Sequence, residues 1–157
     1  MLSQHQRSVC LSVVSTDLPV ASGVETVGTL YQKDHERFDL VLTEPIVQDY
    51  VPAGFPTPVP APRLVWLELS PYRVAMTVQG NGQFSYRHLW EQGIYGPSRY
   101  WLSDAIVQVP QSLPLRNFTR SLVLQGRPLP TLLRVEYELW SGALPLGRYV
   151  LNLDIHH

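Results

Sequence analysis

Ring-bearing side chains recur at every second position between residues 84 and 90, and they are the best candidates in this sequence for binding chemistry. Side chains two positions apart on a β-strand share one face, so the rings would form a row made of Phe84, Tyr86, His88 and Trp90. Such a row can line an apolar ligand pocket or stack on bases and sugars. Aromatic residues are equally common in cores and in interfaces between proteins. We therefore treat these four residues as a candidate ligand-binding or interface face.

Residues that could ligate a metal ion cluster at two places, and neither spacing predicts a metal site. Residues 33 to 37 read Lys-Asp-His-Glu-Arg, but adjacent side chains of a strand point to opposite faces, and the cluster is typical of a solvated turn. Asp154 and His156 could share a strand face, although residues this near a chain end are usually solvated. We expect no metal ion and no cofactor.

The common motifs of nucleophilic catalysis and phosphate binding are missing from the sequence. It contains no G-x-S-x-G element, and Gly80-Asn-Gly82 predicts a tight hairpin turn with no helix after it to bind phosphate. Carboxylates at Glu68, Glu136 and Glu138 fall on the predicted outer faces of strands, where acidic residues are ordinary. We assign no catalytic residue, and an enzyme of the lyase or hydrolase type is the least favoured class.

Two short stretches resemble segments that occur in the same order in bacterial chorismate lyases. They are Ser-Arg-Tyr-Trp-Leu at 98 to 102 and Pro-Leu-Gly-Arg-Tyr at 145 to 149. The resemblance implies an arginine directly after the first stretch, where this chain has Ser103, and a helical segment between the two, where this sequence predicts strands. Because of these departures the lyase activity is not carried over.

The surface is expected to be poor in charge. Charged residues make up 16% of the 157 residues, against about 25% in typical soluble domains, and Lys33 is the single lysine beside eleven arginines. Lysine is depleted in interfaces and arginine is enriched there, so much of the surface could be covered by protein partners; a codon bias against lysine would produce the same composition. The net charge of −1 offers no basic patch for nucleic acid.

The sequence predicts neither a membrane span nor a disulfide. No run approaches eighteen apolar residues, the first seven residues lack the apolar core of a signal peptide, and Cys10 is the only cysteine. We expect a soluble protein that is cytoplasmic or part of a particle, although the compartment itself stays undetermined.

Residues 45 to 62 form the compositional break of the chain. Five prolines fall between 52 and 62, and proline removes a ladder donor and fixes φ, so the segment is predicted to be extended. It could be a stiff crossover within the fold or an arm that binds a partner. In the second case the contact residues would be Phe55, Pro56, Pro58 and Pro60.

Strict alternation of apolar and polar residues predicts strands along most of the chain. It is clearest at 132 to 155, which reads as a hairpin of two strands. In the first strand Leu133, Val135 and Tyr137 alternate with charged residues, and Leu151 and Leu153 continue the pattern in the second. With turn signals at regular intervals, about nine to ten strands are expected in one all-β domain over 1 to 157. The predicted fold is an antiparallel β-sandwich or flattened barrel, and a closed ligand-holding barrel is the other possibility.

Three functions remain open from the sequence. The first is a non-catalytic structural or assembly module, a subunit of a larger complex such as a phage or viral particle, with proteins as its partners. The second is a β-barrel that carries a small apolar ligand against residues 84 to 90. An enzyme is the third. A native mass measurement separates the first two, because a carrier would be a monomer with extra mass.

Overall fold

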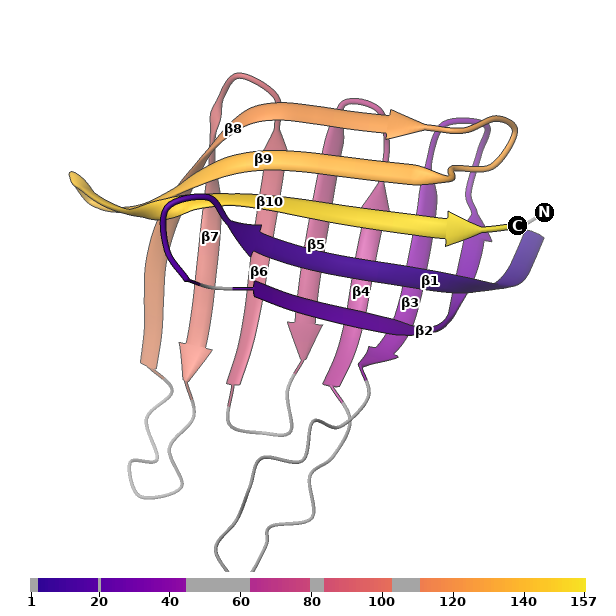
Figure 1. Ribbon diagram of the computed structural model, residues 1–157, viewed down its shortest axis with the longest axis horizontal. Helices are drawn as coiled ribbons and strands as arrows, with labels where there is room; N and C mark the ends of the chain where they lie inside the picture. Colours follow the sequence, from indigo (N-terminus) through magenta and orange to yellow (C-terminus); the bar gives the residue numbers. More distant parts are fainter. Residues whose placement is uncertain (1–2, 20, 45–62, 80–83, 103–110) are drawn as a thin grey trace, which may run out of the picture.

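In a computed structural model the chain forms ten antiparallel strands, and the structure describes residues 3–19, 21–44, 63–79, 84–102 and 111–157 (Figure 1). The strands, in chain order, are β1 (Ser3–Ser15), β2 (Ala21–Gln32), β3 (Phe38–Glu44), β4 (Arg63–Leu69), β5 (Arg73–Gln79), β6 (Phe84–Glu91), β7 (Tyr95–Leu102), β8 (Gln111–Gln125), β9 (Leu132–Ser141) and β10 (Leu144–His156). Among the described residues no helix is long and apolar enough to cross a membrane.

The ten strands close into one barrel. Each strand pairs with its neighbours in the sequence, and β1 also pairs with β10 from Ser8 opposite His156 to Ser15 opposite Tyr149. A sandwich would leave unpaired strand edges, whereas every strand here has a hydrogen-bonded neighbour on both sides. The all-β prediction is therefore confirmed in its barrel form, and the sandwich form does not apply.

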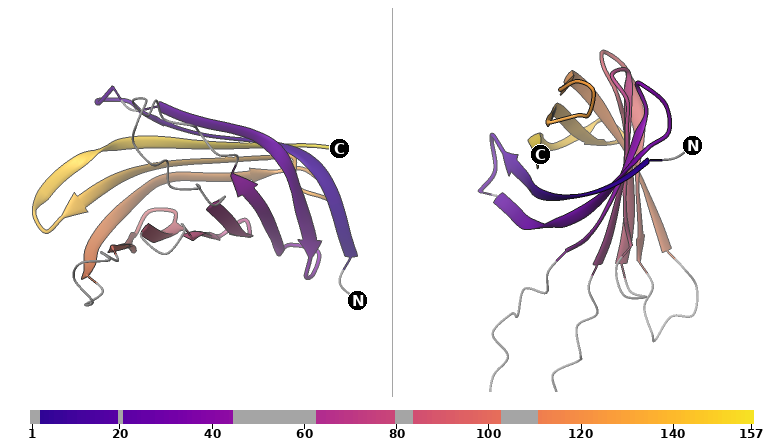
Figure 2. Two further views of the ribbon diagram at one scale, coloured as in Figure 1. Left: turned by 90° about the horizontal axis from the view of Figure 1, so that it is seen from below. Right: turned by 90° about the vertical axis from the view of Figure 1, so that its right-hand side faces the viewer.

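The barrel is flattened into two walls whose strands cross. Figures 1 and 2 show β8, β9, β10, β1 and β2 running across β3 to β7. Strand β8 belongs to both walls, because residues 111–118 pair with β7 and residues 116–125 pair with β9. A bulge between Thr119 and Ser121 interrupts its register, and such a bulge bends a strand and increases its twist. This bend helps β8 to pass from one wall to the other.

Alternating apolar residues fill the interior, as the sequence predicts. On β9 the side chains of Leu133, Val135 and Tyr137 are buried, and on β10 those of Leu151 and Leu153 are fully buried. Burying one such side chain stabilises the fold by about 1.5–3 kcal/mol. The predicted loop at 141–147 is shorter than expected, because β9 and β10 continue to Ser141 and Leu144 around a turn of two residues.

The barrel has two ends with different connections. The end with the β2–β3, β4–β5, β6–β7 and β8–β9 turns also holds the C-terminus, and we call it the terminal end (Figure 1). We call the opposite end, where β3 ends at Glu44 and β4 begins at Arg63, the proline end. The predicted partner-binding residues Phe55, Pro56, Pro58 and Pro60, and the predicted turn at 80–82, lie outside the described residues.

Candidate functional site

The row predicted on β6 points into the barrel. Trp90 is fully buried, His88 is 3% exposed, and Tyr86 is half-buried. They face inward because Tyr86, His88 and Trp90 lie opposite the buried residues Val78, Met76 and Val74 of β5. Phe84 lies opposite Leu102 of β7 in the same register. The structure thus places the rings of Tyr86, His88 and Trp90 in the interior, and the side chain of Phe84 lies outside what the structure describes.

Tyrosines from three other strands meet this row inside the barrel. The ring of Tyr100 on β7 stacks on Tyr86 at 5.3 Å between centroids, and His88 stacks on Trp90 at 5.1 Å. Tyr137 of β9 lies 5.1 Å from Trp90 and 5.5 Å from Tyr149 of β10. We call these six rings, which belong to Tyr86, His88, Trp90, Tyr100, Tyr137 and Tyr149, the aromatic cluster.

A chain of buried hydrogen bonds ties the aromatic cluster to β7 and β8. His88 Nδ1 lies 2.7 Å from Ser98 Oγ, and its Nε2 lies 3.2 Å from the hydroxyl of Tyr100. Asn117 Nδ2 donates to Ser98 Oγ at 2.8 Å and to the Leu89 carbonyl oxygen at 3.0 Å. Thr119 Oγ1 completes the chain by donating to Asn117 Oδ1 at 3.2 Å. Ser98, Asn117 and Thr119 are fully buried.

The partners of Ser98 indicate which imidazole nitrogen carries the proton. Asn117 Nδ2 can only donate, so Ser98 Oγ accepts from it. If the Ser98 hydroxyl then donates to His88 Nδ1, this fully buried hydroxyl has an acceptor, and Nε2–H donates to the oxygen of Tyr100. With the other tautomer, the Ser98 hydroxyl would have no acceptor among the described residues, which is costly at a buried site.

His88, Tyr100 and Tyr137 of the aromatic cluster are neutral near pH 7. Burial lowers the pKa of His88 to about 4, because the charged imidazolium loses its hydration. Burial raises the pKa values of Tyr100 and Tyr137, and the hydroxyls of Tyr86 and Tyr149 raise them further. The cluster therefore offers hydrogen bonds without a formal charge.

The indole of Trp90 carries an unsatisfied donor. Its Nε1 is buried, and no described residue accepts a hydrogen bond from it. Leaving such a group unpaired in a protein interior costs about 1–3 kcal/mol. The Nε1 of Trp140 is in the same state, but Trp140 lies opposite the exposed Arg116 on the outer face of β8 and β9. The interior thus keeps one donor, next to His88 and Tyr137, that a bound acceptor could satisfy.

A cavity of about 40 Å³ lies beside Tyr86. Its walls come from β1, β2, β4, β5 and β6, with the lining residues Leu11, Val13, Ser22, Gly23, Val24, Val65, Met76, Val78 and Tyr86. A water molecule needs about 10–15 Å³ by this kind of measure, so the space admits only a few atoms.

Ser98 and His88 are not placed to act as an accessible nucleophile and base. Ser98 and His88 resemble a nucleophile and its base in their separation, but Ser98 Oγ is enclosed by Asn117 and is fully buried. A nucleophile must reach its substrate, and this hydroxyl is not accessible. The chain of hydrogen bonds instead fixes the orientation of the His88 ring and of Tyr100.

The sequence revealed only part of this site. Gly93, Gly96 and Pro97 are typical of a loop over residues 91–98, so the sequence alone does not place Ser98 on a strand face. In the structure β7 begins at Tyr95, and Gly96 is needed there because a Cβ at this position would lie 2.3 Å from the Leu89 carbonyl oxygen. Asn117 and Thr119 alternate inward on β8, but alternation cannot show that they meet His88.

The two possible metal clusters of the sequence have other roles. Asp34 Oδ1 accepts hydrogen bonds from the backbone N–H groups of Glu36 and Arg37 and so closes the β2–β3 turn. Asp154 and His156 are exposed. Among the described residues no group of three or more metal-ligating side chains is gathered.

Comparison with known proteins identifies the fold. No protein-family model matches the chain, and no curated protein matches it either. The chain is similar in structure to the ywiB protein from Bacillus subtilis. The two superpose with a TM-score of 0.62 over 99% of this chain and 94% of the ywiB chain, at 12% sequence identity. At this identity the likeness shows a common β fold and carries no statement about function.

Proposed function

We propose that this protein binds a small, uncharged, largely apolar molecule inside the proline-end half of its barrel. The observation that carries the proposal is the aromatic cluster, in which rings from four strands converge inside the barrel. One of its rings, Tyr86, borders a cavity, and the N–H of Trp90 in the cluster has no acceptor among the described residues. Small-molecule sites are typically apolar and aromatic, with a few well-placed polar groups.

Charge complementarity supports an uncharged ligand. His88 is neutral and the tyrosines keep their protons, so no charge in the cluster would offset that of an ion. Burying an unpaired charge is expensive. An aromatic molecule with one hydrogen-bond acceptor matches both the ring faces and the Trp90 donor.

The ligand must enlarge the present cavity. About 40 Å³ is well below the roughly 300 Å³ of small-molecule pockets. Tyr86 is half-buried and borders the cavity, and rotation of its side chain breaks no pairing between strands. We expect this ring to move when the ligand enters.

The test is titration with an uncharged fluorescent naphthalene, N-phenyl-1-naphthylamine, on two matched variants. Val24→Phe fills the cavity, whereas Val27→Phe places the same ring on the same strand at a position 63% exposed. We expect saturable binding of one probe per chain, weakened at least about tenfold by Val24→Phe and unchanged by Val27→Phe. Circular dichroism verifies that both variants are folded.

Native mass measurement separates this proposal from the assembly module. A monomer that carries an additional small-molecule mass supports ligand binding. A discrete oligomer without bound small molecules, together with equal probe binding by both phenylalanine variants, would favour a structural subunit and refute the carrier function.

A further inference from the structure

A second hollow lies on the outer face of the barrel, on the opposite side of β6 and β7 from the aromatic cluster. Its volume is about 300 Å³, and its lining residues are Arg87, Leu89, Pro97, Arg99 and Trp101. They face outward because they alternate with the inward-facing His88, Ser98 and Tyr100. We call this hollow the arginine groove.

Two like charges face each other across the arginine groove. Arg87 and Arg99 are directly opposite in the antiparallel pair of β6 and β7, an arrangement that destabilises a sheet because the two β-carbons are only about 5 Å apart. Arg148 and Glu138, which are also directly opposite, have opposite charges and pair at 3.4 Å. Asp39 and Glu68 are another like-charged opposed pair, but each of them has a cationic partner, Lys33 and Arg87 respectively. The arginine pair therefore departs from a local rule of sheet stability.

Among the described residues, Arg87 has an acidic partner and Arg99 has none. Arg87 forms an ion pair with Glu68 at 3.2 Å and donates to Thr77 Oγ1 at 2.8 Å. Arg99 is exposed and makes no hydrogen bond or ion pair with any described residue. Because a guanidinium stays protonated in proteins, Arg99 presents a full positive charge to whatever occupies the groove.

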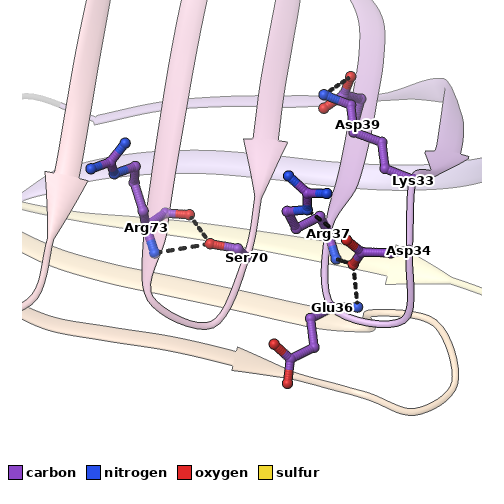
Figure 3. A network of polar contacts seen from close by, with 7 residues as sticks. All are labelled: Lys33, Asp34, Glu36, Arg37, Asp39, Ser70 and Arg73. Atoms are coloured by element: carbon purple, nitrogen blue, oxygen red, sulfur yellow. Dashed lines mark hydrogen bonds and ion pairs between the residues drawn. The ribbon is translucent and has the colours of Figure 1, made fainter.

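In the hollow next to the arginine groove, the charged side chains form ion pairs with one another. A hollow of about 320 Å³ shares Arg87 and Leu89 with the arginine groove and extends to the β2–β3 and β4–β5 turns. There Lys33 pairs with Asp39 at 3.1 Å and Arg37 with Asp34 at 2.6 Å, and Figure 3 shows both pairs. The uncompensated charge of Arg99 thus distinguishes the arginine groove from this adjoining hollow.

The remaining walls of the groove are apolar. Leu89 and Trp101 are half-buried, and Pro97 borders them. Arginine recognises carboxylate and phosphate groups through paired hydrogen bonds, while a tryptophan and a leucine provide a surface for an apolar or aromatic group. The volume is at the lower limit of small-molecule sites.

We propose that the arginine groove binds a small aromatic molecule that carries a carboxylate or phosphate, with the oxyanion on Arg99 and the ring against Trp101 and Leu89. Its ligand is anionic, in contrast to the uncharged molecule proposed for the interior. The inference depends only on residues of the outer face of β6 and β7 and does not require the interior site.

The test uses three naphthalene probes that differ in charge: 1-naphthoate, 1-naphthyl phosphate and the uncharged 1-naphthamide. Isothermal titration calorimetry should show binding of one or both anions and much weaker binding of the amide. A preference for the carboxylate or the phosphate identifies the oxyanion. A rising salt concentration should weaken the binding of the anionic probes, because their contact with Arg99 is electrostatic and solvent-exposed.

Two glutamine variants with the same change of net charge provide the control. Arg99→Gln should weaken anion binding at least about tenfold, since it removes a charged donor pair. Arg134→Gln, on β9 of the other wall and paired with Glu136 at 3.0 Å, should leave it unchanged. Val24→Phe, which fills the interior cavity, should also have no effect, so this result is independent of the interior proposal.

Three outcomes would overturn the assignment. They are equal binding of the amide and the anions, equal loss in the Arg99 and Arg134 variants, and no measurable binding at millimolar concentrations. The first would mean that the groove recognises only the ring. The second would indicate a general effect of charge, and the third would leave Arg99 as an ordinary solvated side chain.

Discussion

Protonation of His88 should make the barrel less stable in mildly acidic solution. The imidazole is buried and neutral, and burial lowers its pKa to about 4 from the ordinary value of 6.5. Between these two values the unfolded chain binds a proton that the folded chain does not, so the free energy of unfolding falls as the pH falls. The stability that depends on a neutral His88 is fully present above about pH 6.5 and is lost as the pH falls to about 4.

The size of the effect follows from the pKa difference. One pKa unit corresponds to about 1.4 kcal/mol, so the shift of His88 amounts to a loss of about 3 kcal/mol over the whole window. That is a large part of the roughly 5–15 kcal/mol by which domains are stable. Asp34, whose pKa is lowered to about 2 from 3.8, loses its own contribution only at lower pH and does not overlap this window.

Urea unfolding followed by circular dichroism between about pH 7 and pH 4.5 measures this slope. His88→Asn removes the titrating group while keeping a polar atom near Ser98 Oγ, and His35→Asn changes an exposed histidine as the control. The wild type and the His35 variant should lose about 2 kcal/mol or more between pH 6.5 and 4.5, and the His88 variant should lose much less. Equal slopes in all three proteins would refute the assignment of a neutral, buried His88.

Three further predictions concern stability, and all can be measured by urea unfolding. Leu151→Ala and Tyr137→Ala should each lower the free energy of unfolding by about 2–5 kcal/mol, because both side chains are buried. Glu136 forms a single exposed pair with Arg134, so Glu136→Ala should change it by no more than about 0.5 kcal/mol. Similar losses in all three variants would contradict the inward and outward assignment of β9. Glu138→Ala should lower the free energy of unfolding by about 1 kcal/mol, more than Glu136→Ala, because Glu138 is 13% exposed and pairs with both Arg120 and Arg148. When both arginines are also replaced, Glu138→Ala and Glu136→Ala should have the same effect. Gly96→Ala should cost about 2 kcal/mol since its Cβ would lie 2.3 Å from the Leu89 carbonyl oxygen, and an unchanged midpoint would mean that β6 and β7 separate at no cost.

The sequence determines part of the candidate site through alternation alone. The spacing of Tyr86, His88 and Trp90 places them on one face, and the inward positions of Tyr137 and Tyr149 follow from the pattern of the terminal hairpin. Alternation does not identify partners, however. Ser98 bonds His88, and Asn117 bonds Ser98, only because β7 pairs with both β6 and β8.

The two outward glutamates of β9 show the same limit. Alternation treats Glu136 and Glu138 alike and predicts a small cost for removing either one. In the structure Glu138 lies between Arg120 of β8 and Arg148 of β10, while Glu136 pairs with its strand neighbour Arg134. The difference comes from neighbouring strands, which a pattern along one strand does not report.

What the sequence by itself determined is the class of fold and the direction of most side chains, because period-two alternation and turn residues act locally. Only the tertiary structure decided that the sheet closes, since this depends on the pairing of β1 with β10, whose partners Val9 and Ile155 lie at opposite ends of the chain. Closure also decided that the aromatic row faces an interior rather than a partner. The physical reason is that burial and hydrogen bonding depend on which strands become neighbours, and that choice minimises the free energy of the whole barrel rather than of any single segment.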